Sequence, residues 1–242
     1  MLPLLLACTG VAAAPTSDAV DSAPATCDPA AFPAVEVVKL TTADGITLEA
    51  DWYTAREGDA AVILLHMIPP TWDRTSWDAA FILALRSACR SVLVIDRRGA
   101  GGSGGTAADA YTGDLGVNDA RAAVDYVRSR KADGFTLVGA SNGTTTALDY
   151  ATTAVEAGYA APLSMVFWSP GQYTETNHRM NKLDLARLML VYPDSEAAWP
   201  EAKRARDPGT WTFLPYVGNK HGTMAFGTAS DPSAAIVAFI RG

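Results

Sequence analysis

Short apolar runs alternate with helix-like segments from residue 35 almost to the end of the chain. The runs at 61–66 (AVILLH) and 91–96 (SVLVID) are nearly continuous in apolar residues, which is typical of strands buried on both faces of a sheet. Ala43-Asp44-Gly45 predicts a hairpin turn between the first two strands. Strands are expected at 35–40, 46–53, 61–66, 91–96, 135–138, 163–168, 188–192 and 211–217.

Segments with helical signals lie between these strands. Thr75-Ser76-Trp77-Asp78 matches a capping box, with apolar residues following to about Ala88. Asn118 is a candidate helix cap, and further helices are expected at 142–158 and 233–240. Strands alternating with helices predict an α/β fold whose mostly parallel sheet is covered on both faces. In such sheets the functional site lies at the carboxyl ends of the strands.

The length and composition fit one folded domain with an N-terminal extension. The chain has 242 residues, 49% of them hydrophobic, and a net charge of −7. Hydrophobic residues at this level exclude a disordered chain, and the acidic balance argues against nucleic acid as a partner. Residues 9–33 are rich in Ala, Pro, Thr, Ser and Asp and are interpreted as a flexible tether. The domain is expected at 34–242.

The first eight residues point to export. Leu5-Leu6-Ala7-Cys8 resembles the bacterial lipobox, in which the cysteine is lipidated after cleavage. This pattern predicts a signal peptide over 1–8, lipidation of Cys8 and a lipid anchor in a bacterial cell envelope. The segment departs from this pattern because it lacks a positive n-region and its apolar run is short. The alternatives are an ordinary short signal peptide, with a periplasmic or secreted protein, or a chance apolar start. Export also bears on Cys27 and Cys89, which either pair in an oxidising compartment or are two unrelated thiols.

The motif Gly139-Ala140-Ser141-Asn142-Gly143 matches G-x-S-x-G. It follows a predicted strand and opens a predicted helix, which is the context of a nucleophile elbow. A second match at 101–105, around Ser103, lies in a glycine-rich loop that does not run from strand into helix. Ser141 is therefore the candidate nucleophile, and Ser103 is interpreted as structural.

A serine nucleophile needs a base, and the chain has three histidines. His178 lies in a polar stretch and His66 ends a buried strand, whereas His221 follows the last strand. His221 is therefore the candidate base. The acid that orients it should follow the strand at 188–192, where Glu196 is preferred and Asp194 stays an alternative.

The oxyanion hole requires two backbone amides. Asn142, directly after the nucleophile, supplies the first candidate. The second is expected in the loop His66-Met67-Ile68-Pro69-Pro70. Proline carries no N–H, which leaves Met67 and Ile68, and Ile68 is preferred.

Together these residues resemble the α/β-hydrolase superfamily, and in particular its lidless esterases and dienelactone-hydrolase-like members. The stretch 96–103 is similar to the D-x-R-G-x-G-x-S element of that fold, and His221-Gly222-Thr223 to the surroundings of the family histidine. The resemblance implies a carboxylesterase-like serine hydrolase that forms an acyl-enzyme, takes a small acyl ester and needs no cofactor. Counting strands as the family does also leads to Glu196. Only about 19 residues separate Trp168 from Leu188, so little or no cap is expected.

Other functions are less consistent with the sequence. Gly99 to Gly104 also fits G-x-G-x-x-G, with Asp119 placed as a ribose-binding acid, but these glycines do not open a helix and Asp119 does not end a strand. No cysteine and histidine spacing predicts a metal site. A non-catalytic surface lipoprotein on a hydrolase scaffold, or a serine acyltransferase or peptidase, remains the alternative.

Overall fold

The computed structural model describes residues 26–32, 35–56, 58–111 and 115–242. Eight strands form one sheet in the order β1-β2-β4-β3-β5-β6-β7-β8. β1 and β2 pair antiparallel, β2 runs antiparallel to β4, and all other pairs are parallel. The strands are β1 Glu36–Thr41, β2 Thr47–Tyr53, β3 Ala61–Leu65, β4 Ser91–Ile95, β5 Phe135–Ala140, β6 Ser164–Trp168, β7 Leu188–Pro193 and β8 Thr212–Tyr216.

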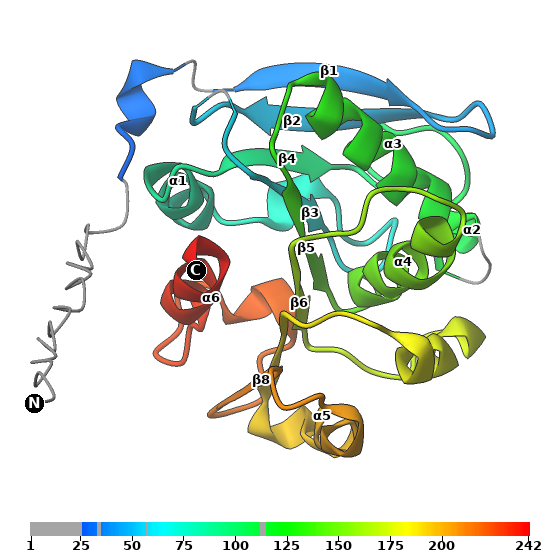
Figure 1. The fold of residues 1–242 in the computed structure, drawn as a ribbon, viewed down its shortest axis with the longest axis vertical. Coiled ribbons are helices and arrows are strands. Elements are labelled where there is room, and N and C mark those ends of the chain that lie inside the picture. Colours follow the sequence, from blue (N-terminus) through cyan, green and yellow to red (C-terminus); the bar gives the residue numbers. More distant parts are fainter. Residues whose placement is uncertain (1–25, 33–34, 57, 112–114) are drawn as a thin grey trace, which may run out of the picture.

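Helices cover both faces of this sheet, with α1 and α6 on one side and α3 and α4 on the other (Figure 1). The α-helices are α1 Ala79–Ser87, α2 Ala107–Tyr111, α3 Gly116–Ser129, α4 Gly143–Asp149, α5 Ala198–Glu201 and α6 Ser233–Arg241. A π-helical turn, Tyr150–Ala154, continues α4. Short 3₁₀ segments are η1 Pro29–Ala31, η2 Arg74–Ser76, η4 Glu175–Lys182, η5 Asp194–Glu196, η6 Arg204–Arg206 and η7 Gly222–Ala225.

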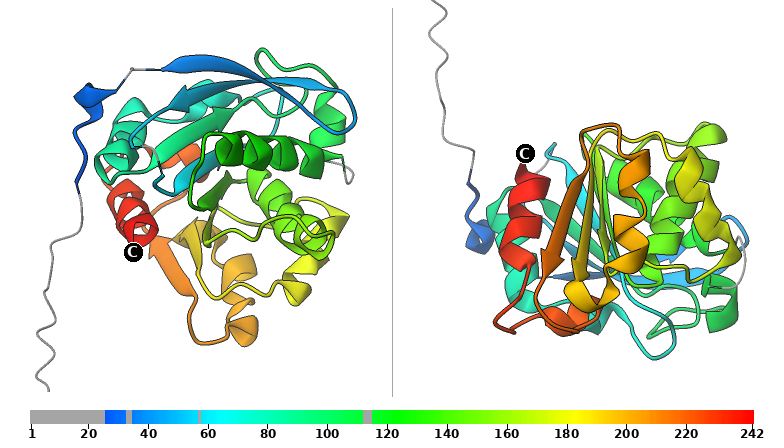
Figure 2. Two further views of the ribbon diagram at one scale, coloured as in Figure 1. Left: turned by 45° about the horizontal axis from the view of Figure 1, so that its top comes forward. Right: turned by 90° about the horizontal axis from the view of Figure 1, so that it is seen from below.

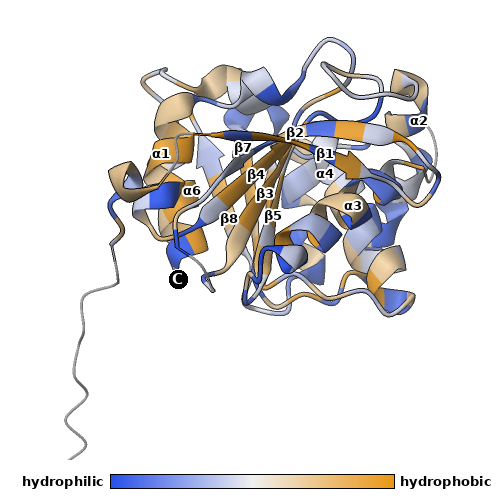
Figure 3. Cartoon of the chain, turned by 90° about the horizontal axis from the view of Figure 1, so that it is seen from above, coloured by the Kyte–Doolittle hydropathy of each residue, from blue (hydrophilic) through white to orange (hydrophobic). Residues whose placement is uncertain are grey.

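The burial of the strands explains why they occupy the centre. Every residue of β3, β4, β5, β6 and β7 is buried, and hydrophobic strands lie between the helix layers (Figure 3). Strands covered on both faces require continuous apolar runs. β2 instead buries every second residue. The predicted α/β class with a mostly parallel sheet is therefore confirmed.

Two predicted helix starts are wrong. α1 begins at Ala79, and the side chain of Asp78 caps it by accepting from the amides of Ala80 and Phe81. Thr75 lies in η2 instead, where its amide and hydroxyl donate to Asp73. The carboxylate directly before the apolar segment caps the helix in place of the predicted box. α3 begins at Gly116, so Asn118 lies inside its first turn and is not the cap.

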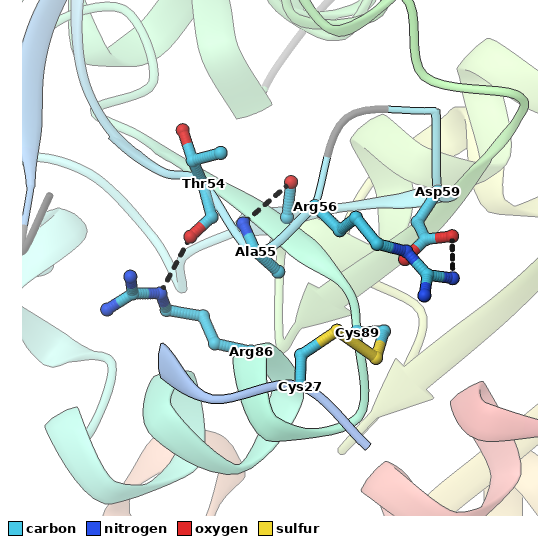
Figure 4. Close-up of a disulfide and its surroundings, with 8 residues drawn as sticks. Cys27, Thr54, Ala55, Arg56, Asp59, Arg86 and Cys89 are labelled. Carbon is cyan, nitrogen blue, oxygen red and sulfur yellow. Dashed lines mark hydrogen bonds and ion pairs between the residues drawn. A yellow bond between two sulfur atoms is a disulfide. The ribbon is translucent and has the colours of Figure 1, made fainter. Parts of the chain in front are cut away.

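The N-terminal segment 26–32 is fastened to the domain. A disulfide joins Cys27 to Cys89, across 62 residues of sequence (Figure 4). The amide of Cys27 donates to the carbonyl of Ser87 over 3.0 Å, and Arg86 donates to the carbonyl of Pro29 over 2.9 Å. The pairing that the sequence left open is therefore present. The last part of the predicted tether lies against the carboxyl end of α1.

Cys8 and the predicted signal peptide lie outside the described residues. In the part of the chain that is described, no helix is both long enough and apolar enough to cross a bilayer.

Candidate active site

Ser141 lies at the tight turn between β5 and α4. Its φ is 50°, a left-handed backbone conformation that is uncommon for a residue with a side chain. The turn is crowded. A Cβ on Gly139 would lie 2.6 Å from the backbone of Gly143, and one on Gly143 would lie 2.3 Å from the carbonyl oxygen of Leu65. Glycine on both sides is therefore a steric requirement, as expected of a nucleophile elbow.

Tyr173 occupies the space beside the serine. Its hydroxyl donates to the carbonyl of Ser169 and lies close enough to the side chain of Ser141 for that side chain to affect the pKa of Tyr173. Burial raises the pKa of Tyr173 far above its ordinary value, so the phenol is neutral.

His221 and Glu196 form a pair. Nδ1 of His221 lies 2.7 Å from Oε1 of Glu196, and both side chains are about one-third exposed or less, at 28% and 32%. Glu196 reaches the imidazole from η5, which directly follows β7. The other candidate, Asp194, accepts from the amide of Gly218 over 3.0 Å. Of the two carboxylates, Glu196 is thus the one in contact with the histidine.

The loop that carries His221 lies against the elbow. The amide of Gly222 donates to Oγ of Ser169 over 2.8 Å, and a Cβ on Gly222 would lie 3.7 Å from that of Ala140, the neighbour of Ser141. The rings of Tyr173 and His221 are 6.3 Å apart and nearly perpendicular. The serine and the histidine therefore lie on the same side of the molecule, with Tyr173 touching both.

Among the described residues, no hydrogen bond joins Ser141 to His221, whose Nδ1 is bonded to Glu196. Hydrogen bonds of catalytic groups are often long or poorly aligned before substrate binds.

The loop after β3 lies on the other side of the elbow. Its first residue, His66, is fully buried, and desolvation together with the nearby Arg97 lowers the pKa of His66 to about 3. The imidazole is therefore neutral. Nε2 accepts from the amide of Arg97, which places the proton on Nδ1, where it is donated to the carbonyl of Met67 over 2.8 Å. His66 thus orients the loop.

The candidate oxyanion amides are available. Among the described residues, the amides of Met67, Ile68 and Asn142 donate to no protein group. Met67 is 1% exposed whereas Ile68 is 40% exposed, so the Ile68 side of the loop faces solvent. The bond between Pro69 and Pro70, which follow, is cis.

The motifs that the sequence set aside have structural roles. The hydroxyl of Ser103 donates to the carbonyl of Asp96 over 2.6 Å and accepts from the amide of Glu49. Asp119 is fully buried and paired with Arg98 at 2.7 Å, so it is not free to bind a ribose. Ser169 and Arg97 were not predicted as site residues, and no sequence pattern placed Tyr173 beside Ser141.

An open cavity of about 590 Å³ lies beside this cluster. Ile68 and Tyr173 border it, together with Tyr111, Gln172, Thr174 and Glu175. A smaller cavity of about 300 Å³ includes Ser91, the first residue of β4, in its wall and so lies toward the amino end of that strand. The larger cavity is the one that adjoins Ser141, through Tyr173.

The described residues offer one group of side chains close enough to share a metal ion, made of Cys27, Asp59 and Cys89. Both sulfurs of this group are joined in the disulfide (Figure 4), and Cys89 lies just before β4, at the edge of the sheet opposite to the one where Ser141 follows β5. It is therefore not a candidate metal centre.

Comparison with known proteins identifies the architecture. No family model and no curated protein matches the sequence. An esterase from Pyrococcus furiosus is similar in structure at 17% identity, with a TM-score of 0.68, over 87% of this chain and 91% of that one. An α/β serine hydrolase without a lid, from Xanthomonas campestris, has 18% identity and a TM-score of 0.61 over 87% of this chain and 95% of that one.

A dienelactone hydrolase from Anabaena variabilis is also similar, at 12% identity and a TM-score of 0.63, over 86% of this chain and 94% of that one. The chain has the α/β-hydrolase fold. In this α/β-hydrolase fold, the segment between β6 and β7 holds η4 and no cap domain, in agreement with the expectation of an uncovered site. Ser141, His221 and Glu196 follow β5, β8 and β7, at the carboxyl edge of the sheet. The course of the sheet and the helices around it can be followed in Figure 2.

Proposed function

We propose that this protein is a serine hydrolase that cleaves carboxylic esters through an acyl-enzyme. Ser141 is the nucleophile, His221 the general base and Glu196 the acid that orients the imidazole. The observation that carries the proposal is the 2.7 Å contact of Glu196 with His221, on a loop packed against a strained serine turn. Structural neighbours that are named esterases and a dienelactone hydrolase support the same reaction class.

In the acylation step, the serine hydroxyl donates to Nε2 of His221. The imidazole takes the proton as the serine oxygen attacks the ester carbonyl. Glu196 accepts the hydrogen bond of Nδ1–H and stabilises the imidazolium that forms. The negative charge that develops on the carbonyl oxygen is bound by the amides of Asn142 and Ile68.

The tetrahedral intermediate collapses when His221 gives its proton to the leaving alcohol, leaving the acyl group on Ser141. In the second half, His221 takes a proton from water, and the hydroxide formed attacks the acyl carbonyl. Breakdown of that intermediate returns the proton to the serine and releases the acid. No cofactor enters any step.

The cavity favours small acyl esters. Its volume of about 590 Å³ falls within the roughly 300–1,000 Å³ of small-ligand sites, and its rim includes Ile68 and Tyr173 from opposite sides of the serine. The described segment between β6 and β7 holds η4 and no cap domain that would enclose a long acyl chain. We therefore expect short-chain esters to be cleaved faster than long-chain triglycerides.

A fluorophosphonate probe tests the proposal directly. The wild type should label, Ser141→Ala should not, and Ser103→Ala should label normally because Ser103 serves the backbone of the glycine-rich loop. Hydrolysis of p-nitrophenyl acetate should be abolished by Ser141→Ala and kept by Ser103→Ala. A wild type that is folded yet neither labels nor hydrolyses short esters would indicate a non-catalytic binding protein. Turnover that survives in Ser141→Ala would refute the assignment of the nucleophile.

We further propose that the protein is exported and anchored through a lipid on Cys8. The disulfide between Cys27 and Cys89 supports export, because such bonds persist in oxidising compartments. In a bacterial host, radiolabelled palmitate should be incorporated into the wild type and not into Cys8→Ser, and only the wild type should fractionate with membranes. Equal labelling of both, or retention of both in the cytoplasm, would contradict the anchor.

A further inference from the structure

Arg97 is a buried cation at the base of the candidate site. Its side chain is fully buried, and it lies between the loop after β3 and the start of α4. The guanidinium donates to five oxygens, which are the carbonyls of His66 and Met67 at 3.3 Å, the carbonyl of Ala110 at 2.8 Å, Oδ1 of Asn142 at 2.9 Å and Oγ1 of Thr146 at 2.8 Å.

None of these partners carries a charge. Within the described residues, Arg97 forms no ion pair, whereas its neighbour Arg98 is paired with Asp44 and Asp119. Burial lowers the pKa of Arg97 to about 10, so the guanidinium is still protonated at neutral pH. A buried charge is costly unless it is paired. Here the positive charge is directed at neutral carbonyl and amide oxygens instead.

Two of those oxygens, the Met67 carbonyl and Oδ1 of Asn142, belong to the two segments whose amides would form the oxyanion hole. The carbonyl of Met67 and the N–H of Ile68 are parts of one peptide unit. This unit is trans, and the cis bond in the loop is the one between Pro69 and Pro70. In a trans peptide the carbonyl and the N–H point in opposite directions. Since Arg97 and His66 hold the Met67 oxygen, the Ile68 N–H points away from them.

The same guanidinium nitrogen that reaches Ala110 and Thr146 also holds the side chain of Asn142. Asn142 supplies the other candidate amide. One buried group therefore connects two chain segments, after β3 and after β5, whose spacing decides whether both amides reach the same oxyanion. A charged donor on the Met67 carbonyl also polarises that peptide, which strengthens the Ile68 N–H as a donor.

We infer that Arg97 is a positioning residue for the oxyanion hole, fixing the Met67–Ile68 peptide and Asn142 relative to each other and polarising the former. The inference rests on the proposed serine hydrolase function. Arg97 is expected to affect the tetrahedral species, because the interaction of the two amides with the substrate oxygen grows with the negative charge on that oxygen. Ground-state binding of the ester is not expected to depend on it.

The test compares variants that remove one partner of the guanidinium. Arg97→Lys keeps a cation but loses the fork that reaches five oxygens. Asn142→Ala removes one acceptor and keeps both Arg97 and the backbone amide. Thr146→Val, the matched control, removes an acceptor of the same nitrogen that has no part in the oxyanion hole. All three are first checked by thermal denaturation, and Asn142→Ala carries the test if Arg97→Lys does not fold.

Two quantities are measured, kcat/KM for p-nitrophenyl acetate and Ki for a trifluoromethyl ketone, which forms a tetrahedral adduct on Ser141. Losing a whole oxyanion donor typically costs roughly 10²–10³ in rate, so misplacing one is expected to lower kcat/KM by about 10- to 100-fold. Ki should rise by the same factor while KM changes little, and Thr146→Val should stay within about threefold.

The inference is overturned if folded Arg97→Lys and Asn142→Ala change Ki no more than Thr146→Val does. It is also overturned if the loss lies in KM alone. Failure of the proposed function is separate, because then the wild type itself would neither label with fluorophosphonate nor bind the ketone.

Discussion

The contact between Glu196 and His221 allows a quantitative prediction for Glu196→Gln. Glutamine keeps the size of the side chain and an oxygen that can accept from Nδ1, so the variant removes charge and little else. With 2.7 Å between Nδ1 and Oε1, a unit charge pair gains about 1.5 kcal/mol at a dielectric of about 80 and about 3 kcal/mol at about 40. Both side chains are partly exposed, so the pair lies between these limits.

That energy is gained only when the imidazole becomes charged, in the transition state. Removing it is expected to lower kcat by roughly 10- to 200-fold. If the amide turns its NH₂ toward the ring, it stabilises the wrong tautomer, and the loss is larger still. KM should change little, because no contact with substrate is removed.

Steady-state hydrolysis of p-nitrophenyl acetate measures the effect, with Asp194→Asn as the matched control. Asp194 binds the amide of Gly218 and should tolerate the change within about threefold. The reasoning is refuted if Glu196→Gln stays within threefold of the wild type, or if Asp194→Asn loses as much activity.

Three further predictions concern stability. His66 has a folded-state pKa of about 3 against an ordinary value of 6.5, so between these pH values only the unfolded chain binds a proton at His66. The free energy of unfolding should therefore be highest above about pH 6.5 and fall as the pH is lowered toward 3. The expected loss at pH 5 is about 2 kcal/mol. Urea denaturation at pH 7 and pH 5 measures this loss of unfolding free energy, which should be smaller in His66→Gln. An equal loss in His66→Gln and in the wild type would contradict the role of His66. Gly139→Ala places a Cβ 2.6 Å from the backbone of Gly143 and should lower Tm by about 2–12 °C, given overpacking costs of about 1–3 kcal/mol. Gly104→Ala, with nothing nearer than 3.5 Å, is its control, and equal losses would refute the steric argument. Opening the disulfide, which spans 62 residues, should lower the free energy of unfolding by about 4 kcal/mol on the chain-entropy model. In urea denaturation, Cys27→Ser should be as stable as the reduced wild type. A variant as stable as the oxidised wild type would contradict this prediction.

The fold was predictable because its signals are local. Five strands are buried along their whole length, so their apolar runs were continuous in the sequence and their order with the helices defined the class. The serine turn was predictable for a similar reason, since the two glycines around Ser141 are steric requirements of a strand that passes directly into a helix. The catalytic roles of Ser141, His221 and Glu196 stay predictions.

The contacts that position the site depend on segments far apart in the chain. Arg97 lies next to the arginine of a family motif, and only the folded chain brings Asn142 to its side chain. Tyr173 follows β6 after a turn and could not be placed beside Ser141 without the coordinates. The start of α1 was misjudged because two polar residues compete for the same local role, and Asp78, the nearer to the apolar segment, caps the helix.

The disulfide also fixes the point at which the N-terminal segment joins the domain. Cys89 lies just before β4 begins, so the staple sits at the amino edge of a sheet whose opposite edge carries Ser141 and His221. Under the proposed lipid anchor at Cys8, the chain would therefore join the domain at the edge away from Ser141 and His221. The attachment point would leave the edge with the candidate site uncovered.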